Sequence, residues 1–136
     1  MKYKIKKLTD KIFLILCPDH YDLCMLFLRY QEFYESPNSR FQGKPFEILD
    51  YMEWYSKNRK GNVFFSYPYD WGGFNLPVRS VQDCILNIQD WNKYDTEMLN
   101  IVHKVGLDSY LIGVSGEKVS VMQHEIAHGM YSTVAE

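Results

Sequence analysis

The residues best suited to chemistry stand near the C-terminus, in the stretch VMQHEIAHGMY at 121–131. Two histidines, His124 and His128, are four residues apart, and Glu125 directly follows the first of them. Imidazole nitrogens at this spacing on a helix can bind one zinc ion, which leaves a coordination position for water. Zinc lowers the pKa of that water, and a neighbouring carboxylate can take its proton. The stretch therefore predicts zinc-dependent hydrolysis with Glu125 as the general base.

An amphipathic helix over about residues 117–133 is predicted to position these side chains. Its apolar residues recur at spacings of three, four and four, which places them on one stripe; they are Val119, Met122, Ile126 and Met130. At about 100° per residue, both histidines and Tyr131 lie away from that stripe. We expect the stripe to anchor the helix and the other side to present the imidazoles. Tyr131 is then either a donor to a developing oxyanion or a packing residue.

The run HEIAH matches the HExxH signature, so this segment resembles the zincin metallopeptidases. The resemblance implies that His124 and His128 bind zinc and that Glu125 acts as the base. It also implies that the preceding strand, 109–114, binds an extended peptide or protein substrate by strand addition. The stretches FYESP, YMEWYS and DWGGFN further resemble phage and bacterial proteins that carry HExxH near the C-terminus, a likeness that implies no function.

The third zinc ligand is not specified by the motif. Metzincins continue as HExxHxxGxxH, but Val134 stands where the third histidine would be, so that subclass is excluded. His103, near the end of a predicted helix, is the candidate by residue type, although a solvated histidine there also suits the helix dipole. His20 is expected to be structural or exposed. The chain ends on Glu136 within the predicted helix, which leaves open a C-terminal continuation that supplies the ligand; this form would then bind zinc weakly or not at all.

The remaining elements predict one α+β domain over 1–136, with a small, mostly antiparallel sheet packed with several helices and the HExxH helix last. Strands are expected where short apolar runs are bounded by turn residues, at 11–17, 62–67 and 109–114. Helices are expected at about 19–35, 45–59, 80–88 and 93–105. The proposed N-caps are Asp19, Ser80 and Asn92, and Gly106 ends the fourth helix. The segments 36–45 and 68–77 are expected to be loops.

Composition and charge narrow the class of protein. With 46% hydrophobic, 24% charged and 16% aromatic residues, the chain is typical of a soluble globular domain rather than a disordered one. A net charge of -2 makes nucleic-acid binding a weak alternative, and the short basic runs KYKIKK and KNRK suit solvated faces. We expect neither a signal peptide nor a membrane span. The three cysteines lack metal-ligand spacing and suit buried free thiols in the cytoplasm.

A second interpretation is a non-catalytic protein-interaction module, phage-encoded, with a degenerate or incomplete metal site. The stretches YMEWYS (51–56) and WGGFNLP (71–77) carry tryptophan and tyrosine side chains that can anchor a partner. The same side chains can equally pack in the core and the loops. A protein purified without zinc and unaffected by chelators would favour this interpretation. The substrate and the oligomeric state are not specified by the sequence.

Overall fold

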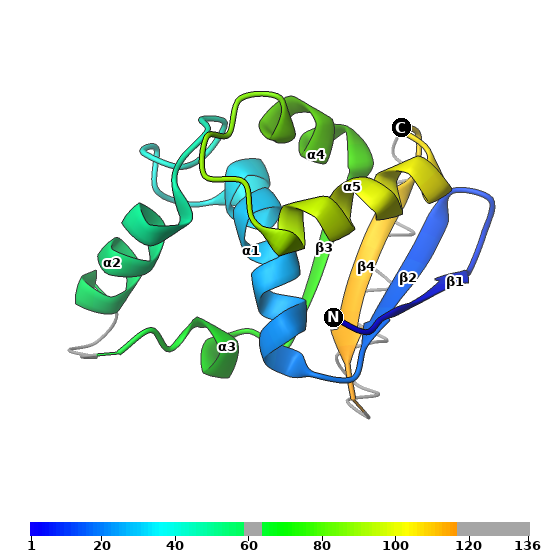
Figure 1. Cartoon of the computed structure of the whole chain (residues 1–136), viewed down its shortest axis with the longest axis horizontal. Helices are drawn as coiled ribbons and strands as arrows, with labels where there is room; N and C mark the ends of the chain where they lie inside the picture. The colour runs from blue at the N-terminus through cyan, green and yellow to red at the C-terminus, as the bar shows by residue number, and fades with distance from the viewer. Residues whose placement is uncertain (59–63, 117–136) are drawn as a thin grey trace.

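A four-stranded sheet in the order β1–β2–β4–β3 organises the computed structural model, which describes residues 1–58 and 64–116 (Figure 1). The strands are β1 (Lys4–Lys7), β2 (Ile12–Cys17), β3 (Gly73–Pro77) and β4 (Tyr110–Ser115). The central pair, β2 and β4, is parallel, whereas β1 pairs with β2 and β3 pairs with β4 in antiparallel fashion. The predicted α+β class and the mostly antiparallel sheet are therefore confirmed.

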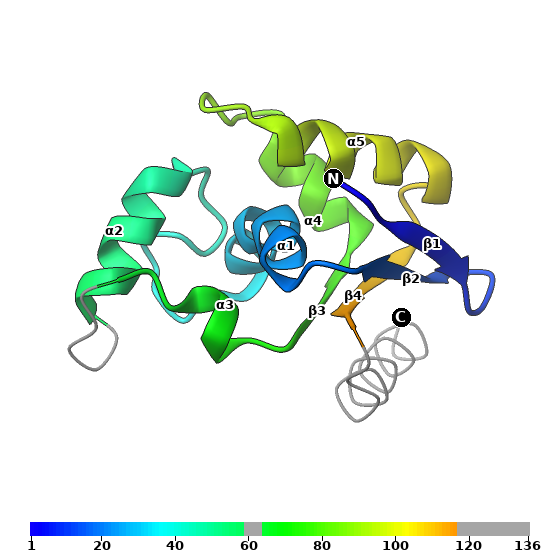
Figure 2. The same cartoon turned by 60° about the horizontal axis from the view of Figure 1, so that its bottom comes forward.

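Five helices accompany this sheet in the described residues: α1 (His20–Glu35), α2 (Ile48–Asn58), α3 (Tyr67–Asp70), α4 (Val78–Ile85) and α5 (Lys93–Val105). Helices α1, α4 and α5 lie on one face of the sheet, and α2 lies beyond α1 on the side away from β1 (Figures 1 and 2). No helix in the described ranges is long and apolar enough to cross a membrane.

Local capping explains where α1 and α5 begin and where α5 ends. The side chain of Asp19 accepts a hydrogen bond from the backbone N–H of Asp22 at 2.9 Å, which starts α1. Asn92 and Asp95 form a reciprocal capping box at the start of α5. Gly106 follows α5 with φ 87°, a backbone conformation that residues other than glycine rarely adopt. The caps proposed at Asp19 and Asn92, and the stop at Gly106, are confirmed.

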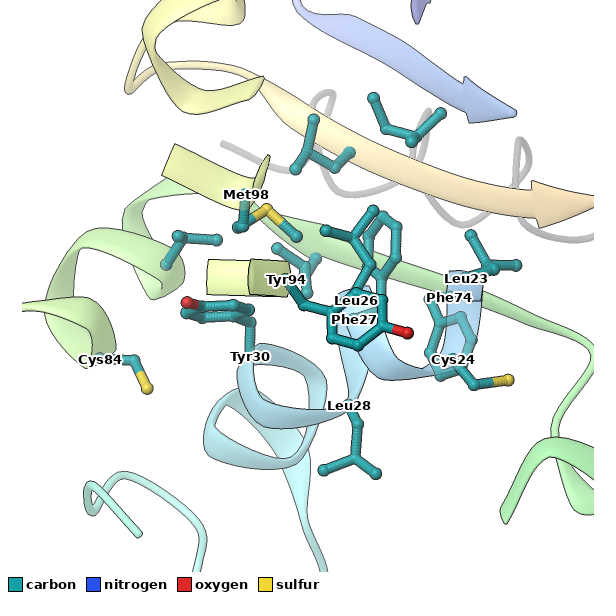
Figure 3. Packing of buried hydrophobic residues seen from close by; sticks show 14 of the residues in the cluster. Leu23, Cys24, Leu26, Phe27, Leu28, Tyr30, Phe74, Cys84, Tyr94 and Met98 are labelled. Carbon is teal, nitrogen blue, oxygen red and sulfur yellow. The ribbon is translucent and has the colours of Figure 1, made fainter. Parts of the chain in front are cut away.

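The main core forms where α1 packs on the sheet (Figure 3). Phe27 stacks on Phe74 of β3 with ring centroids 5.5 Å apart, and its ring also lies over Gly113 in β4. A Cβ atom at Gly113 would come within 2.5 Å of that ring, so the glycine permits the helix to approach the strand closely.

The central strands are apolar except for Ser115 at the end of β4, because both of their faces are buried. Ile15 and Leu111 belong to the core under α1. The alternate positions form a separate buried cluster, which comprises Ile12, Leu14, Tyr110, Ile112 and Val114. Burial on both sides of parallel strands is the reason that 12–17 and 110–115 read as continuous apolar runs rather than as alternating ones.

A buried ion network ties three helices together. Arg29 in α1 is 1% exposed, and its Nε and Nη2 atoms donate to the two carboxylate oxygens of Asp95, each at 3.1 Å. Its Nη1 atom donates to Asp90 at 2.7 Å, and the other oxygen of Asp90 accepts from the backbone N–H of Ile48 at 2.7 Å. The start of α2 and the cap of α5 are thereby fixed to one guanidinium.

The strand predicted at 62–67 is wrong for the residues that the structure describes. Residues 64–66 are not a strand, and Tyr67 begins α3, whose first turn contains Pro68. The carbonyl of Ser66 accepts from the N–H groups of Tyr69 and Asp70, which turns the chain into the helix. Residues 62 and 63 lie outside the described ranges. Pro68 directly follows the apolar run. Because proline has no backbone N–H group to donate to a neighbouring strand, it was the sequence signal against a strand.

The segment 68–77, predicted as a loop, instead contains most of α3 and the edge strand β3. Within β3, Phe74 and Leu76 are buried while their neighbours are half-buried. The flanking glycine and proline obscure this period-2 pattern, because both residues are typical of turns. The start of the third predicted helix is also wrong: α4 begins at Val78 after Pro77, and Ser80 lies inside it rather than at its cap.

The basic start of the chain forms an additional strand that the sequence did not predict. β1 lies at the edge of the sheet, and Lys4, Lys6 and Lys7 are exposed there. Lysines on an edge strand discourage pairing with other chains. The KYKIKK run therefore has a structural explanation in the sheet edge.

The expectation that 109–114 receives a peptide substrate is contradicted. The strand exists as β4, but it is hydrogen-bonded to β2 on one side and to β3 on the other. All six of its residues are buried. A central strand has no unpaired edge to offer, so strand addition to β4 is excluded.

Replacing Arg29 with methionine is expected to lower the free energy of unfolding by about 3–5 kcal/mol, because it leaves the carboxylate of Asp95 buried without its partner. The matched control is Arg79→Met, since the Arg79–Asp108 pair at 2.6 Å is 62% and 82% exposed. That change should cost less than about 1 kcal/mol. Urea denaturation followed by circular dichroism measures both, and equal losses would contradict the structural role of Arg29.

Candidate functional site

The HExxH residues are not placed by the structure. His124, Glu125, His128 and Tyr131 lie outside the described residues, as does the helix predicted for 117–133. The described chain ends just before that segment, where β4 finishes at Ser115 and Gly116 turns with φ 59°. The described chain therefore ends at the carboxyl end of the central parallel strands.

His103 is the one predicted metal ligand that the structure places. It is exposed on the last turn of α5, next to Lys104. Cationic side chains at this position suit the negative end of the helix dipole. The chain passes from α5 through Gly106 to the start of β4 (Figure 1), so it reaches the sheet at the end opposite Ser115. At a rise of about 3.3 Å per residue, the two ends of β4 are roughly 17 Å apart.

No metal-binding group is assembled by the described residues alone. Within 1–58 and 64–116, no three side chains of His, Cys, Asp or Glu gather in a way that could hold a metal ion.

At the carboxyl ends of β2 and β4, His20 forms a small polar cluster. Its Nδ1 atom is hydrogen-bonded to the hydroxyl of Ser115, which is buried, and its Nε2 atom lies 2.7 Å from the carbonyl oxygen of Trp71. The Sγ atom of Cys24, one turn further along α1, is 3.4 Å from Nε2. These contacts connect α1, β4 and the segment between α3 and β3.

Hydrogen-bond roles define what His20 does. The carbonyl of Trp71 can only accept, so Nε2 carries the proton, and in the neutral ring Nδ1 accepts from the hydroxyl of Ser115. Both nitrogens are then engaged, and neither is available to a metal without the loss of a hydrogen bond. The expectation that His20 is structural agrees with these contacts.

A cavity of about 130 Å³ lies between α1, α2 and the segment after α3. Its walls include Tyr51, Trp54 and Tyr55 from YMEWYS, and Trp71 from WGGFNLP. The two aromatic stretches noted in the sequence therefore meet in space. Tyr51 and Tyr55 are buried, Trp54 is half-buried and Trp71 is 44% exposed, so the same group serves the core on one side and solvent on the other.

Glu32 of α1 also lines this cavity. One carboxylate oxygen accepts from the hydroxyl of Tyr51 at 2.8 Å, and the other accepts from the hydroxyl of Tyr67 at 2.9 Å. Burial raises the pKa of the Glu32 carboxyl, while hydrogen bonds from Tyr51, Tyr67 and Ser36 oppose that rise.

Glu32 was missed in the sequence, although a signal was present. It follows Arg29 by three residues in a helix that is otherwise rich in buried apolar side chains. Charged residues are seldom buried unless they are paired. Because Arg29 and Glu32 stand within such a helix, the sequence indicated that each is buried together with a polar partner.

Comparisons with protein-family models, with curated proteins and with solved structures found no match, and they assign no family to the chain.

Replacing His20 with alanine is expected to lower the free energy of unfolding by about 1–3 kcal/mol, because it leaves the buried hydroxyl of Ser115 without its partner. The matched control, His103→Ala, should change it by less than about 0.5 kcal/mol. Chemical denaturation with a chelator present removes any contribution from bound metal. Equal effects of the two substitutions would contradict a structural role for the His20 ring.

Proposed function

We propose that the protein is a zinc-dependent hydrolase that cleaves peptides, with His124 and His128 as zinc ligands and Glu125 as the general base. The single observation that supports this proposal is the HEIAH run, in a sequence segment whose helical apolar stripe includes neither histidine. Bound zinc would supply an acidic water. Glu125 would accept the proton of that water and return it to the leaving amine, and Tyr131 would donate to the oxyanion.

The described donors narrow the choice of a third ligand. Both ring nitrogens of His20 are already hydrogen-bonded. Cys17 and Cys84 are buried, and burial raises the pKa of both thiols to about 12. Neither belongs to a group of three metal-ligating side chains within the described ranges. The exposed imidazole of His103 is the remaining histidine, and we retain it as the proposed third ligand.

The cysteines also support a cytoplasmic location as part of this proposal. Cys17, Cys24 and Cys84 are all buried and free of disulfides. Buried free thiols suit a reducing compartment.

The proposed role of Glu125 predicts a separation of metal binding from turnover. Glu125→Gln should retain zinc, because the glutamate is not a ligand, and should lower cleavage of a fluorogenic peptide library by at least about a hundredfold, since the base is lost. Glu47→Gln, the same change at an exposed glutamate, should have no effect. Zinc content and peptide cleavage are measured on the same samples. Full activity in Glu125→Gln would refute the mechanism.

The assignment of His103 has its own test. If it is the third ligand, His103→Ala should weaken zinc binding in calorimetric titration by about tenfold or more, because a three-ligand site loses one donor. His20→Gln serves as the control at a histidine that is already hydrogen-bonded. An unchanged zinc affinity in His103→Ala would exclude His103 and leave the roles of His124 and His128 intact.

A further inference from the structure

We propose that the cavity between α1 and α2 binds a methylated ammonium group, with Glu32 as its counter-charge and the rings of Tyr51, Trp54, Tyr55 and Trp71 as its walls. This inference goes beyond the proposed hydrolase and does not depend on zinc. It uses only residues that the structure describes.

The aromatic walls have the arrangement that a cation requires. Tyr51, Trp54 and Tyr55 are spaced by three and four residues in α2, so one side of the helix presents all three. The Tyr51 and Trp54 rings are 5.6 Å apart and inclined by 51°, and those of Trp54 and Tyr55 are 6.4 Å apart and inclined by 66°. The Tyr51 and Tyr55 rings are stacked, 5.9 Å apart and inclined by 29°, so Trp54 stands at an angle to a tyrosine pair, and all three residues line the cavity. The negative faces of aromatic rings attract cations.

The charge of the cavity favours a cation as well. In the described part of the chain, no lysine, arginine or histidine lies within ion-pair distance of Glu32. Its hydrogen bonds come from the neutral hydroxyls of Tyr51 and Tyr67. A partly buried carboxylate without a counter-cation is unfavourable, and a cationic ligand would offset that cost.

The nearest basic side chain of α2 is already engaged outside the cavity. The Nζ atom of Lys57 donates to Glu53 at 2.7 Å, and these side chains are 70% and 65% exposed. Lys57 does not line the cavity. The charge of Glu32 is therefore not balanced by that lysine.

Size and hydrogen-bonding capacity select a methylated ammonium over other cations. A volume of about 130 Å³ is well below the roughly 300–1,000 Å³ of sites for drug-sized ligands, so a single head group suits it. A primary ammonium has three N–H donors to satisfy, and Glu32 is the one carboxylate among the lining residues. A quaternary ammonium has no donors to satisfy, and its methyl groups can contact the rings directly.

Titration of the full chain with choline and with its neutral isostere, 3,3-dimethylbutan-1-ol, tests this inference. Trp54 and Trp71 lie in the cavity, so their fluorescence reports binding once Trp91, the third tryptophan, is replaced by phenylalanine. Choline should bind at least about tenfold more tightly than the neutral alcohol, because only the charged ligand interacts with Glu32 and the ring faces. Equal affinity, or no binding of choline, would overturn the proposal.

A peptide that carries trimethyllysine distinguishes the source of the head group. Tighter binding of this peptide than of choline assigns the site to a modified protein side chain, and tighter binding of choline assigns it to a small molecule or lipid head group. The unmethylated peptide is the control and should bind at least about tenfold more weakly than the methylated one. Preference for the unmethylated peptide would overturn the choice of a methylated cation.

Substitutions in the cavity, with a matched control outside it, test the roles of the lining residues. Glu32→Gln should weaken choline binding by about tenfold or more, whereas Glu53→Gln, the same change at an exposed neighbour, should alter it by less than about twofold. An unchanged affinity in Glu32→Gln would overturn the role of Glu32. If that variant does not fold, as judged by circular dichroism, Trp54→Leu replaces it, with the same expectation. Binding of choline only after Arg59→Ala or Lys60→Ala would also overturn the proposal, because the chain's own cation would then be the ligand.

Discussion

The bidentate contact between Arg29 and Asp95 is the constraint on which the described structure depends. Both side chains are almost completely buried, and Asp95 also accepts from Tyr30 at 2.6 Å and from the backbone of Asn92 at 2.9 Å. The carboxylate of Asp95 thus caps α5 and also neutralises the charge of Arg29 in α1. Through Asp90 the same guanidinium holds the start of α2. Removal of either charge would leave its partner in the core, which makes this arrangement of α1, α2 and α5 strongly specified.

The His20 cluster and the Glu32 cavity both follow from the position of α1. Toward its N-terminus, His20 joins the carboxyl end of β4 to the segment after α3. Three residues after Arg29, Glu32 faces the aromatic side chains of α2, whose start is set by the Arg29 network. Between these ends, Phe27 rests on Gly113 and fixes the distance of the helix from the sheet. A single helix therefore connects the strand that leads to the HExxH segment with the aromatic cavity.

Features encoded by neighbouring residues could be predicted from the sequence. The caps at Asp19 and Asn92 depend on side chains that bond to the next turn, and the apolar runs of β2 and β4 reflect burial of those strands. Features that depend on partners far away in the sequence could not be predicted in this way. The edge strands β1 and β3 are defined by their pairing to β2 and β4, and the central position of β4 is defined by two partners from remote parts of the chain. The Glu32 cavity likewise unites three segments, while the HExxH motif is visible because its spacing is local.

Elemental analysis of the purified full chain tests the central claim most directly, because it asks whether His124 and His128 hold a metal before any substrate is known. We predict one zinc ion per chain in the natural protein and none in the double variant His124→Ala, His128→Ala, whose circular dichroism spectrum should match that of the natural protein. A natural protein without zinc after purification in zinc-containing buffer, or a double variant with an equal zinc content, would contradict it.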